Sequence, residues 1–299
     1  MQPVSKFVET NGVNHHYLEW GNTDNPKVLM FHAVGMCSQI WNFAAKDLAN
    51  DYHVYSFDLR GHGDTEHPEG GITFKQIGAD TASVIQALEL EGSNCIGHSA
   101  GGMSMLIADS MFPGIVGKGV LIDTRVGDSP MALLTPEEQE LRMKRTLQKR
   151  MIWESREVMY EAYRNRPVFK PWTEEVFADY IEGNTRILDD GTAQLKCKPA
   201  VEEEFYANRR HLDTQKVLRG LGGDYVLLVG AYDGAQTSAD AAVEHLKREA
   251  KGFQLKELGA GSHFVPMEHP DLVLRAIRNF IAVSYTHLRA HETLRYLVC

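Results

Sequence analysis

The 299-residue chain lacks the long hydrophobic runs of membrane proteins. No segment approaches the ~18 consecutive apolar residues that a membrane-spanning helix needs. The first residues, MQPVSKFVETNG, contain no apolar signal core. These two absences predict a protein without a membrane span, located in the cytoplasm.

Cysteine is scarce. Apart from Cys299, the chain contains only Cys37, Cys95 and Cys197. No two of them form a CxxC pair, and no histidine–cysteine spacing resembles a zinc site. We therefore expect free thiols in a reducing compartment. The sequence predicts no metal and no other cofactor.

Positively charged residues are fewer than negatively charged ones. The chain has 31 Lys and Arg and 40 Asp and Glu, which gives a net charge of −9. This balance argues against nucleic acid as a partner, so a small-molecule substrate is expected. Hydrophobic residues make up 43% of the chain, which is enough for a globular core. No segment predicts a particular oligomeric state.

The last residues, VSYTHLRAHETLRYLVC (283–299), differ in character from the rest. They resemble the translation of a sequencing-library adapter and its read primer more than a natural amphipathic tail. We interpret 283–299 as a non-native, adapter-derived tail and exclude it from the fold prediction.

The remaining chain alternates between strand and helix patterns. SKFVET, NGVN and HHYLEWG predict a hairpin, since Asn-Gly is a strong turn signal. Buried strands and amphipathic helices then alternate from KVLMFHAVG to VGKGVLIDT, and the rhythm resumes at DYVLLVGAYDG. This order predicts an α/β fold with a mostly parallel central sheet and helices on both faces.

The alternation stops over 128–218, which is rich in charged and aromatic residues. EEQELRMKRTLQKRMIW, SREVMYEAYRNR and TEEVFADYIEGN predict successive helices there. We interpret 128–218 as a helical cap inserted into a core formed by 1–127 and 219–282.

Ser99 lies in GHSAG, a G-x-S-x-G pattern between a predicted strand and a predicted helix. Such a serine sits on a strained turn with its hydroxyl exposed above the sheet. Gly97 and Gly101 need no side chain, because the strand and helix backbones pass close together there. An ordinary glycine-rich turn is the alternative explanation.

Six motifs in order resemble the α/β-hydrolase superfamily: HYLEWG, FHAVG, DLRGHGDT, GHSAGG, LLVGAYDG and GAGSHF. The resemblance covers nearly all of 7–282 and implies the α/β-hydrolase fold with its cap. It also implies a triad in the chain order Ser, Asp, His, with Ser99 as nucleophile and His263 of GAGSHF as base. The serine at position 99 argues against the epoxide hydrolase and haloalkane dehalogenase branches, which use aspartate there.

Two aspartates are candidates for the triad acid. Asp233, in LLVGAYDG, matches the acid-bearing strand and turn of the family and is the preferred candidate. Asp123, in LIDTR, ends the strand before the cap, where some relatives place their acid. A plain Asp-Gly turn is the alternative explanation of Asp233.

The backbone N–H groups of Ala100 and Val34 are the expected oxyanion donors. The family usually has His-Gly where this chain has His32-Ala33, and Ala33 tolerates a positive φ poorly. Asp58 and Arg60 resemble a structural loop near the site, while His62 and His98 are expected to fix loops.

The resemblance implies a cofactor-independent serine hydrolase, and a carboxylic ester is the expected substrate class. A lactone or C–C bond hydrolase is an alternative on the same triad. A receptor-like binding protein with slow or no turnover is the rival from another class. Aromatic cap residues are expected to form the substrate pocket: Trp153, Tyr160, Phe169 and Trp172.

Overall fold

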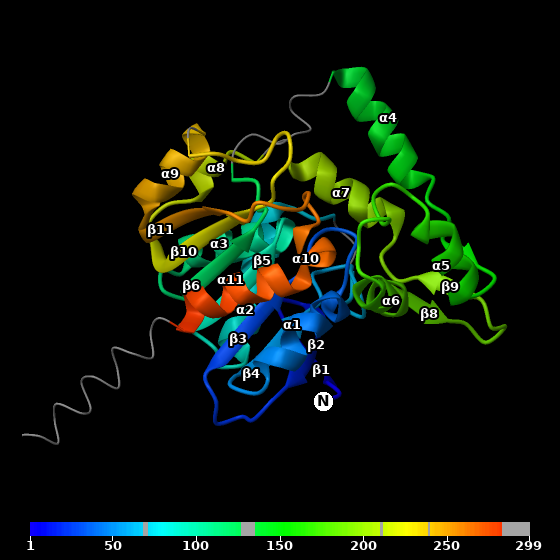
Figure 1. Ribbon diagram of the computed structural model, residues 1–299, viewed down its shortest axis with the longest axis horizontal. Coiled ribbons are helices and arrows are strands. Elements are labelled where there is room, and N and C mark those ends of the chain that lie inside the picture. The colour runs from blue at the N-terminus through cyan, green and yellow to red at the C-terminus, as the bar shows by residue number, and fades with distance from the viewer. Residues whose placement is uncertain (68–70, 127–134, 210–211, 239, 283–299) are drawn as a thin grey trace, which may run out of the picture.

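The computed structural model describes residues 1–67, 71–126, 135–209, 212–238 and 240–282 (Figure 1). Its main sheet has eight strands in the order β1-β2-β4-β3-β5-β6-β10-β11. The strands are β1 (Val4–Thr10), β2 (Val13–Trp20), β3 (Lys27–Phe31), β4 (His53–Phe57), β5 (Ser93–His98), β6 (Val116–Ile122), β10 (Leu221–Val229) and β11 (Ala250–Glu257). The predicted adapter-derived tail, 283–299, lies outside the described residues.

The predicted hairpin is confirmed, since β1 pairs antiparallel with β2 and Thr10 lies opposite Val13. Asn11 and Gly12 have φ values of 53° and 70°, as a tight hairpin turn requires. β2 also pairs antiparallel with β4, whereas the pairs from β4 to β11 are parallel. The α/β prediction of a mostly parallel sheet is therefore correct.

Helices cover both faces of this sheet (Figure 1). The 3₁₀ helix η1 (Ser38–Trp41) and the α-helices α1 (Asn42–Leu48), α10 (Val265–Glu268) and α11 (Pro270–Ala282) belong to one apolar core. The helices of the opposite core are α2 (Phe74–Ala87), α3 (Ala100–Met111) and α9 (Ala241–Glu249). The carboxyl ends of the parallel strands thus meet at one edge of a sheet buried on both faces.

Between β6 and β10 the chain leaves the sheet and forms a separate group of elements, called the insertion below (135–209 and 212–218). Its helices are α4 (Pro136–Leu147), α5 (Arg156–Arg164), α6 (Glu174–Gly183), α7 (Pro199–Arg209) and α8 (Thr214–Val217). Figure 1 shows α4 to α7 on one side of the main sheet, and α6 contacts both η1 and α1.

The insertion also contains strands that the sequence analysis did not predict. β7 (Ile152–Trp153), β8 (Thr185–Ile187) and β9 (Ala193–Leu195) form a small antiparallel sheet in the order β7-β9-β8. The helix predicted over 137–153 ends at Leu147, and its last two residues belong to β7 instead.

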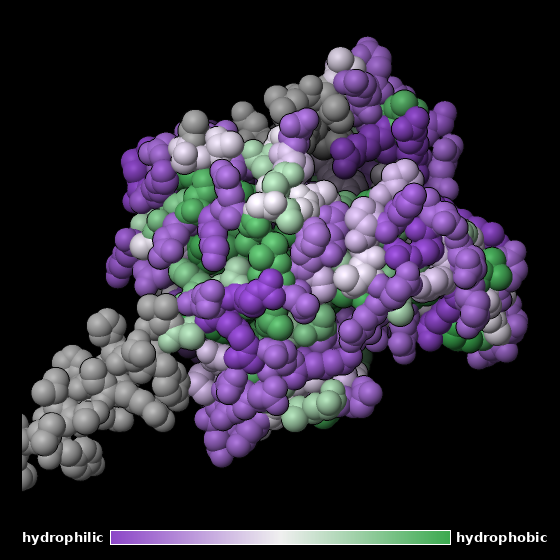
Figure 2. Space-filling view, in the orientation of Figure 1, coloured by the Kyte–Doolittle hydropathy of each residue, from purple (hydrophilic) through white to green (hydrophobic). Residues whose placement is uncertain are grey.

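On the face shown in Figure 2, hydrophilic side chains dominate over α4 and the rest of the insertion, while apolar ones gather around β10 and α11. None of the helices in the described part of the chain has the length and apolarity that crossing a bilayer requires. Cys37, Cys95 and Cys197 are buried free thiols, as expected.

Candidate active site

Ser99 lies on a strained turn between β5 and α3. Its φ of 53° and ψ of −112° are outside the regions that L-residues favour, at a cost of about 1–3 kcal/mol. A Cβ at Gly97 would clash with the backbone of Gly101 and Gly102, and a Cβ at Gly101 would clash with that of Phe31. The glycine pattern therefore has the packing reason that the sequence predicted.

His263 lies in the loop between β11 and α10 and pairs with Asp123. Its Nδ1 lies 3.3 Å from Oδ1 of Asp123, whose side chain is 1% exposed while that of His263 is 32% exposed. A carboxylate can only accept, so Nδ1 carries the proton and Nε2 is left to act as a base. The imidazole is thus oriented by a buried carboxylate at the end of β6.

The preference for Asp233 as the acid is wrong in this structure. Asp233 is exposed on a turn closed by the bond from the Ala235 N–H to the Tyr232 carbonyl, with Gly234 at a φ of 87°. This Asp-Gly turn directs Asp233 into solvent. The neighbouring Tyr232 instead points inward, and its hydroxyl donates to Oδ1 of Asp123 at 2.7 Å.

The turn that holds Asp123 is strained like that of Ser99. Its φ is 43°, and its N–H donates to the carbonyl of Leu228 on the neighbouring strand β10 at 2.8 Å. Burial by itself would raise the pKa of Asp123, but the bonds from His263 and Tyr232 hold the pKa below its ordinary value. Asp123 therefore presents a buried negative charge to the His263 ring.

His98 fixes the loop that carries His263. Its Nε2 donates to the backbone carbonyl of His263 at 2.8 Å. Burial, aided by the nearby charge of His263, lowers the pKa of His98 to about 3, so its ring is neutral at physiological pH. This agrees with the expectation that His98 fixes a loop.

The predicted oxyanion donors, Val34 and Ala100, both line the cavity that contains Ser99. Among the described residues, neither of their amides has a hydrogen-bond partner. Gly35, with a φ of 74°, takes the positive φ of this loop, and Ala33 does not have one. The substitution of alanine for the usual glycine is thereby accommodated.

His62 holds this loop in place. Its Nε2 accepts the N–H of Gly35 at 2.9 Å, and its Nδ1 donates to the Arg60 carbonyl at 3.0 Å. Burial lowers the pKa of His62 to about 3, which keeps the ring in the neutral form that this pair of bonds requires.

A cavity of about 340 Å³ opens beside Ser99. Ser99, Ala100, Val34 and His263 share it with apolar, aromatic and cationic side chains. The further lining residues are Phe74, Met103, Arg125, Arg142, Phe205, Tyr206, Arg209, Tyr232 and Phe264. This volume lies in the range of small-molecule sites.

The aromatic residues predicted for the pocket do not line this cavity. Trp153, Phe169 and Trp172 are buried in an aromatic cluster of the insertion. Tyr160 packs on Phe177, and its hydroxyl donates to Glu174 at the surface. These aromatic side chains fill the core of the insertion, and this packing accounts for them without a ligand.

Sequence reasoning missed the aromatic and cationic residues that the cavity draws from the insertion. Phe205, Tyr206 and Arg209 come from α7, and Arg142 comes from α4. Their only sequence signal is a mixed face of arginine and tyrosine on charged helices, which resembles an ordinary solvated surface.

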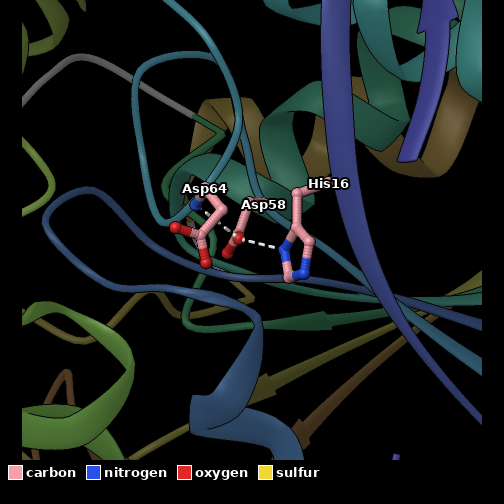
Figure 3. A group of neighbouring side chains, drawn as sticks. All are labelled: His16, Asp58 and Asp64. Carbon is pink, nitrogen blue, oxygen red and sulfur yellow. Dashed lines mark hydrogen bonds and ion pairs between the residues drawn. The ribbon is translucent and has the colours of Figure 1, made fainter. Parts of the chain in front are cut away.

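His16, Asp58 and Asp64 form a compact polar group (Figure 3). Asp58 accepts hydrogen bonds from Nδ1 of His16 at 2.6 Å, from the Ser38 N–H at 2.6 Å and from the Asp64 N–H at 3.0 Å. The Asp64 carboxylate pairs with Lys196. These atoms are thus engaged in tying β2, η1 and the loop after β4 together.

Burial opposes the charge of Asp58, but the bond from His16, the positive potential of His16 and His32 and the Asp64 N–H together outweigh it and lower the pKa of Asp58 to about 2. Arg60 likewise forms a buried bidentate pair with Asp80, at 2.6 and 2.7 Å. The structural roles expected for Asp58 and Arg60 agree with these contacts.

The chain is similar to two curated proteins. It is 22% identical over 284 residues to a 2-(acetamidomethylene)succinate hydrolase of Mesorhizobium japonicum, covering 93% of this chain and 95% of the relative. It is 34% identical over 116 residues to a non-heme chloroperoxidase of Streptomyces lividans, covering 38% and 42% of the two chains. The chain therefore spans less than half of the chloroperoxidase.

The crystal structure of an E-2-(acetamidomethylene)succinate hydrolase superposes with a TM-score of 0.77 and 22% identity, over 94% of this chain and 100% of the other. At this identity the likeness shows a shared fold. A family model described as "Alpha/beta hydrolase family" matches residues 28–276. Because the family model matches most of its length and the fold agrees, the chain belongs to the alpha/beta hydrolase family.

Proposed function

We propose that this protein is a cofactor-independent serine hydrolase of carboxylic esters, with Ser99, His263 and Asp123 as its triad. One observation carries the proposal: a single cavity is lined by a serine on a strained elbow and by a histidine whose far side is held by a buried carboxylate. The membership in a family of hydrolases supports it.

In the proposed reaction, Ser99 Oγ attacks the ester carbonyl while His263 Nε2 takes its proton. Asp123 stabilises the imidazolium that forms, because its carboxylate is buried and charged. The N–H groups of Ala100 and Val34 bind the oxyanion. His263 then protonates the leaving alcohol, and a water activated by the same histidine hydrolyses the acyl-enzyme.

The insertion acts in this proposal as a cap over the reacting carbonyl. α4 and α7 supply the cavity walls that face Ser99, through Arg142, Phe205 and Tyr206. A wall built partly from a separate segment excludes water from one side of the site and selects the substrate. Because α7 contacts α2, the cap is anchored to the helix that carries Phe74.

The test is turnover of a chromogenic ester by the wild type, by Ser99→Ala and by Ser83→Ala. Ser83 is a matched control because it lies on α2, away from the cavity, with its hydroxyl bonded to the Asp80 carbonyl. We expect many turnovers for the wild type and the control, and a loss of roughly four orders of magnitude for Ser99→Ala.

A fluorophosphonate probe should label the wild type and the control at Ser99 and leave Ser99→Ala unlabelled. If Ser99→Ala stays active, the elbow is only a turn and the proposal is wrong. A single labelling event without turnover would instead identify the receptor-like binding protein.

A further inference from the structure

The cavity beside Ser99 is strongly cationic, although the protein as a whole is acidic. Three arginines line it, Arg125 after β6, Arg142 on α4 and Arg209 at the end of α7. No Asp or Glu is among the described residues that line it. In a chain of net charge −9, this concentration of positive charge runs against the average composition.

We propose that these arginines bind a carboxylate group of the substrate, so that the ester hydrolysed at Ser99 carries a second, ionised carboxyl group. The inference rests on the proposed hydrolase function and specifies its substrate class. A guanidinium stays charged at every physiological pH and presents planar N–H donors that match a carboxylate.

Neutral partners hold two of these side chains in place. Arg125 donates from Nη2 to the hydroxyl of Tyr232 at 2.9 Å, and Arg142 lies 5.3 Å from the centre of the Tyr206 ring. Neither forms an ion pair with a described carboxylate. The positive charge of both guanidinium groups is therefore not neutralised by those contacts.

Arg209 links the two parts of this wall. Its Nη2 donates to the backbone carbonyl of Arg125 at 2.8 Å, so the end of α7 is fixed to the segment that follows β6. Arg125 and Arg209 are both half-buried. In such a position a charge is screened less by solvent than it is at an open surface.

The two kinds of lining come from different parts of the fold. Apolar side chains from the core, Val34, Phe74 and Met103, lie with Ser99 and Ala100, whereas the insertion and the segment leading to it supply the arginines. A substrate with its reacting carbonyl at Ser99 and an anionic group toward the insertion would match the apolar and the cationic parts of this lining.

The experiment compares two chromogenic esters of similar size, mono-4-nitrophenyl adipate and its neutral methyl ester. We expect the wild type to prefer the anionic ester in kcat/KM by tenfold or more, because a charge-assisted hydrogen bond is worth roughly that factor. Arg142→Gln should lower kcat/KM about tenfold more for the anionic ester than for the neutral ester, so that the preference of the wild type is lost. Arg145→Gln is the matched control, since it removes an exposed arginine from the same helix without altering the cavity lining.

Binding is measured separately, by calorimetry of adipate and of inorganic phosphate with Ser99→Ala. Saturable adipate binding that Arg142→Gln weakens would support the inference even if no ester were hydrolysed, in which case only the proposed function would fail. Hydrolysis of the neutral ester at Ser99 with no preference for the anionic one would overturn the inference and leave the function standing. Tighter binding of phosphate than of adipate would also overturn it.

Discussion

Replacing Asp123 by asparagine tests the triad acid directly, because the change preserves shape and removes a charge. The side chain is 1% exposed and lies between His263 and Tyr232. Both of their hydrogen bonds reach the same oxygen, Oδ1, while Oδ2 has no partner among the described residues. The outcome therefore depends on how the new amide is oriented.

Each orientation is unfavourable. If the amide oxygen keeps the place of Oδ1, its NH₂ group is buried without an acceptor, which costs about 1–3 kcal/mol. If the amide is reversed, its NH₂ faces Nδ1 of His263 and selects the wrong tautomer. In both cases the anion that stabilises the imidazolium is lost.

We expect kcat for a chromogenic ester to fall by roughly 10³-fold to 10⁴-fold, equivalent to about 4–5 kcal/mol of transition-state stabilisation. KM should change little, because Asp123 is not among the residues that line the cavity. Circular dichroism and urea unfolding would verify that the variant is folded.

Asp233→Asn is the matched control, because it makes the same chemical change at an exposed turn. This turn follows β10, the neighbour of the strand β6 that Asp123 follows. We expect less than a twofold change in kcat. If Asp233→Asn were the damaging change, or if Asp123→Asn kept more than a tenth of the activity, Asp123 would not be the acid.

Three other changes test neighbouring parts of the argument. Tyr232→Phe removes the hydroxyl that donates to Asp123, and should lower kcat for a neutral ester about tenfold; an unchanged kcat would mean that this bond does not position the acid. The pKa of Asp58 is lowered to about 2, so its charge contributes stability that is full above about pH 4 and is lost as pH falls toward 2. The difference in free energy of unfolding between the wild type and Asp58→Asn, measured in urea, should thus shrink by about 1 kcal/mol from pH 6 to pH 3. A difference that stays constant over this range would contradict the role assigned to Asp58. Gly97→Ala places a Cβ against the backbone of α3, and should destabilise the protein by more than about 3 kcal/mol; a variant as stable as the wild type would show that the elbow is not tightly packed.

The sequence by itself determined the features that depend on local backbone geometry and on chain order. Gly97 and Gly101 predicted a close approach of strand and helix, because only glycine permits it, and the structure has that contact. The turn at Asn11 and Gly12 and the alternation of strands and helices were predicted for the same kind of reason. His263 was expected as the base from the resemblance of GAGSHF to the family motif, and the structure places it beside the cavity that contains Ser99.

The tertiary structure decided which aspartate faces His263. Asp123 and Asp233 follow strands β6 and β10, which are neighbours in the sheet, so chain order brings both to the same edge. The choice depends on a φ of 43° at Asp123 and on an Asp-Gly turn that directs Asp233 into solvent. Such turn geometry is set by surrounding contacts, among them the bond from the Asp123 N–H to Leu228.

The substrate cavity also needed the tertiary structure. Arg125, Arg142 and Arg209 are separated along the chain and meet only because α4 and α7 pack against each other beside the end of β6. Trp153 and Trp172, in contrast, have the pattern that a pocket and a core share, and packing assigns them to the core. The apolar character of such side chains predicts that they are covered, whereas the neighbouring elements determine whether protein or ligand covers them.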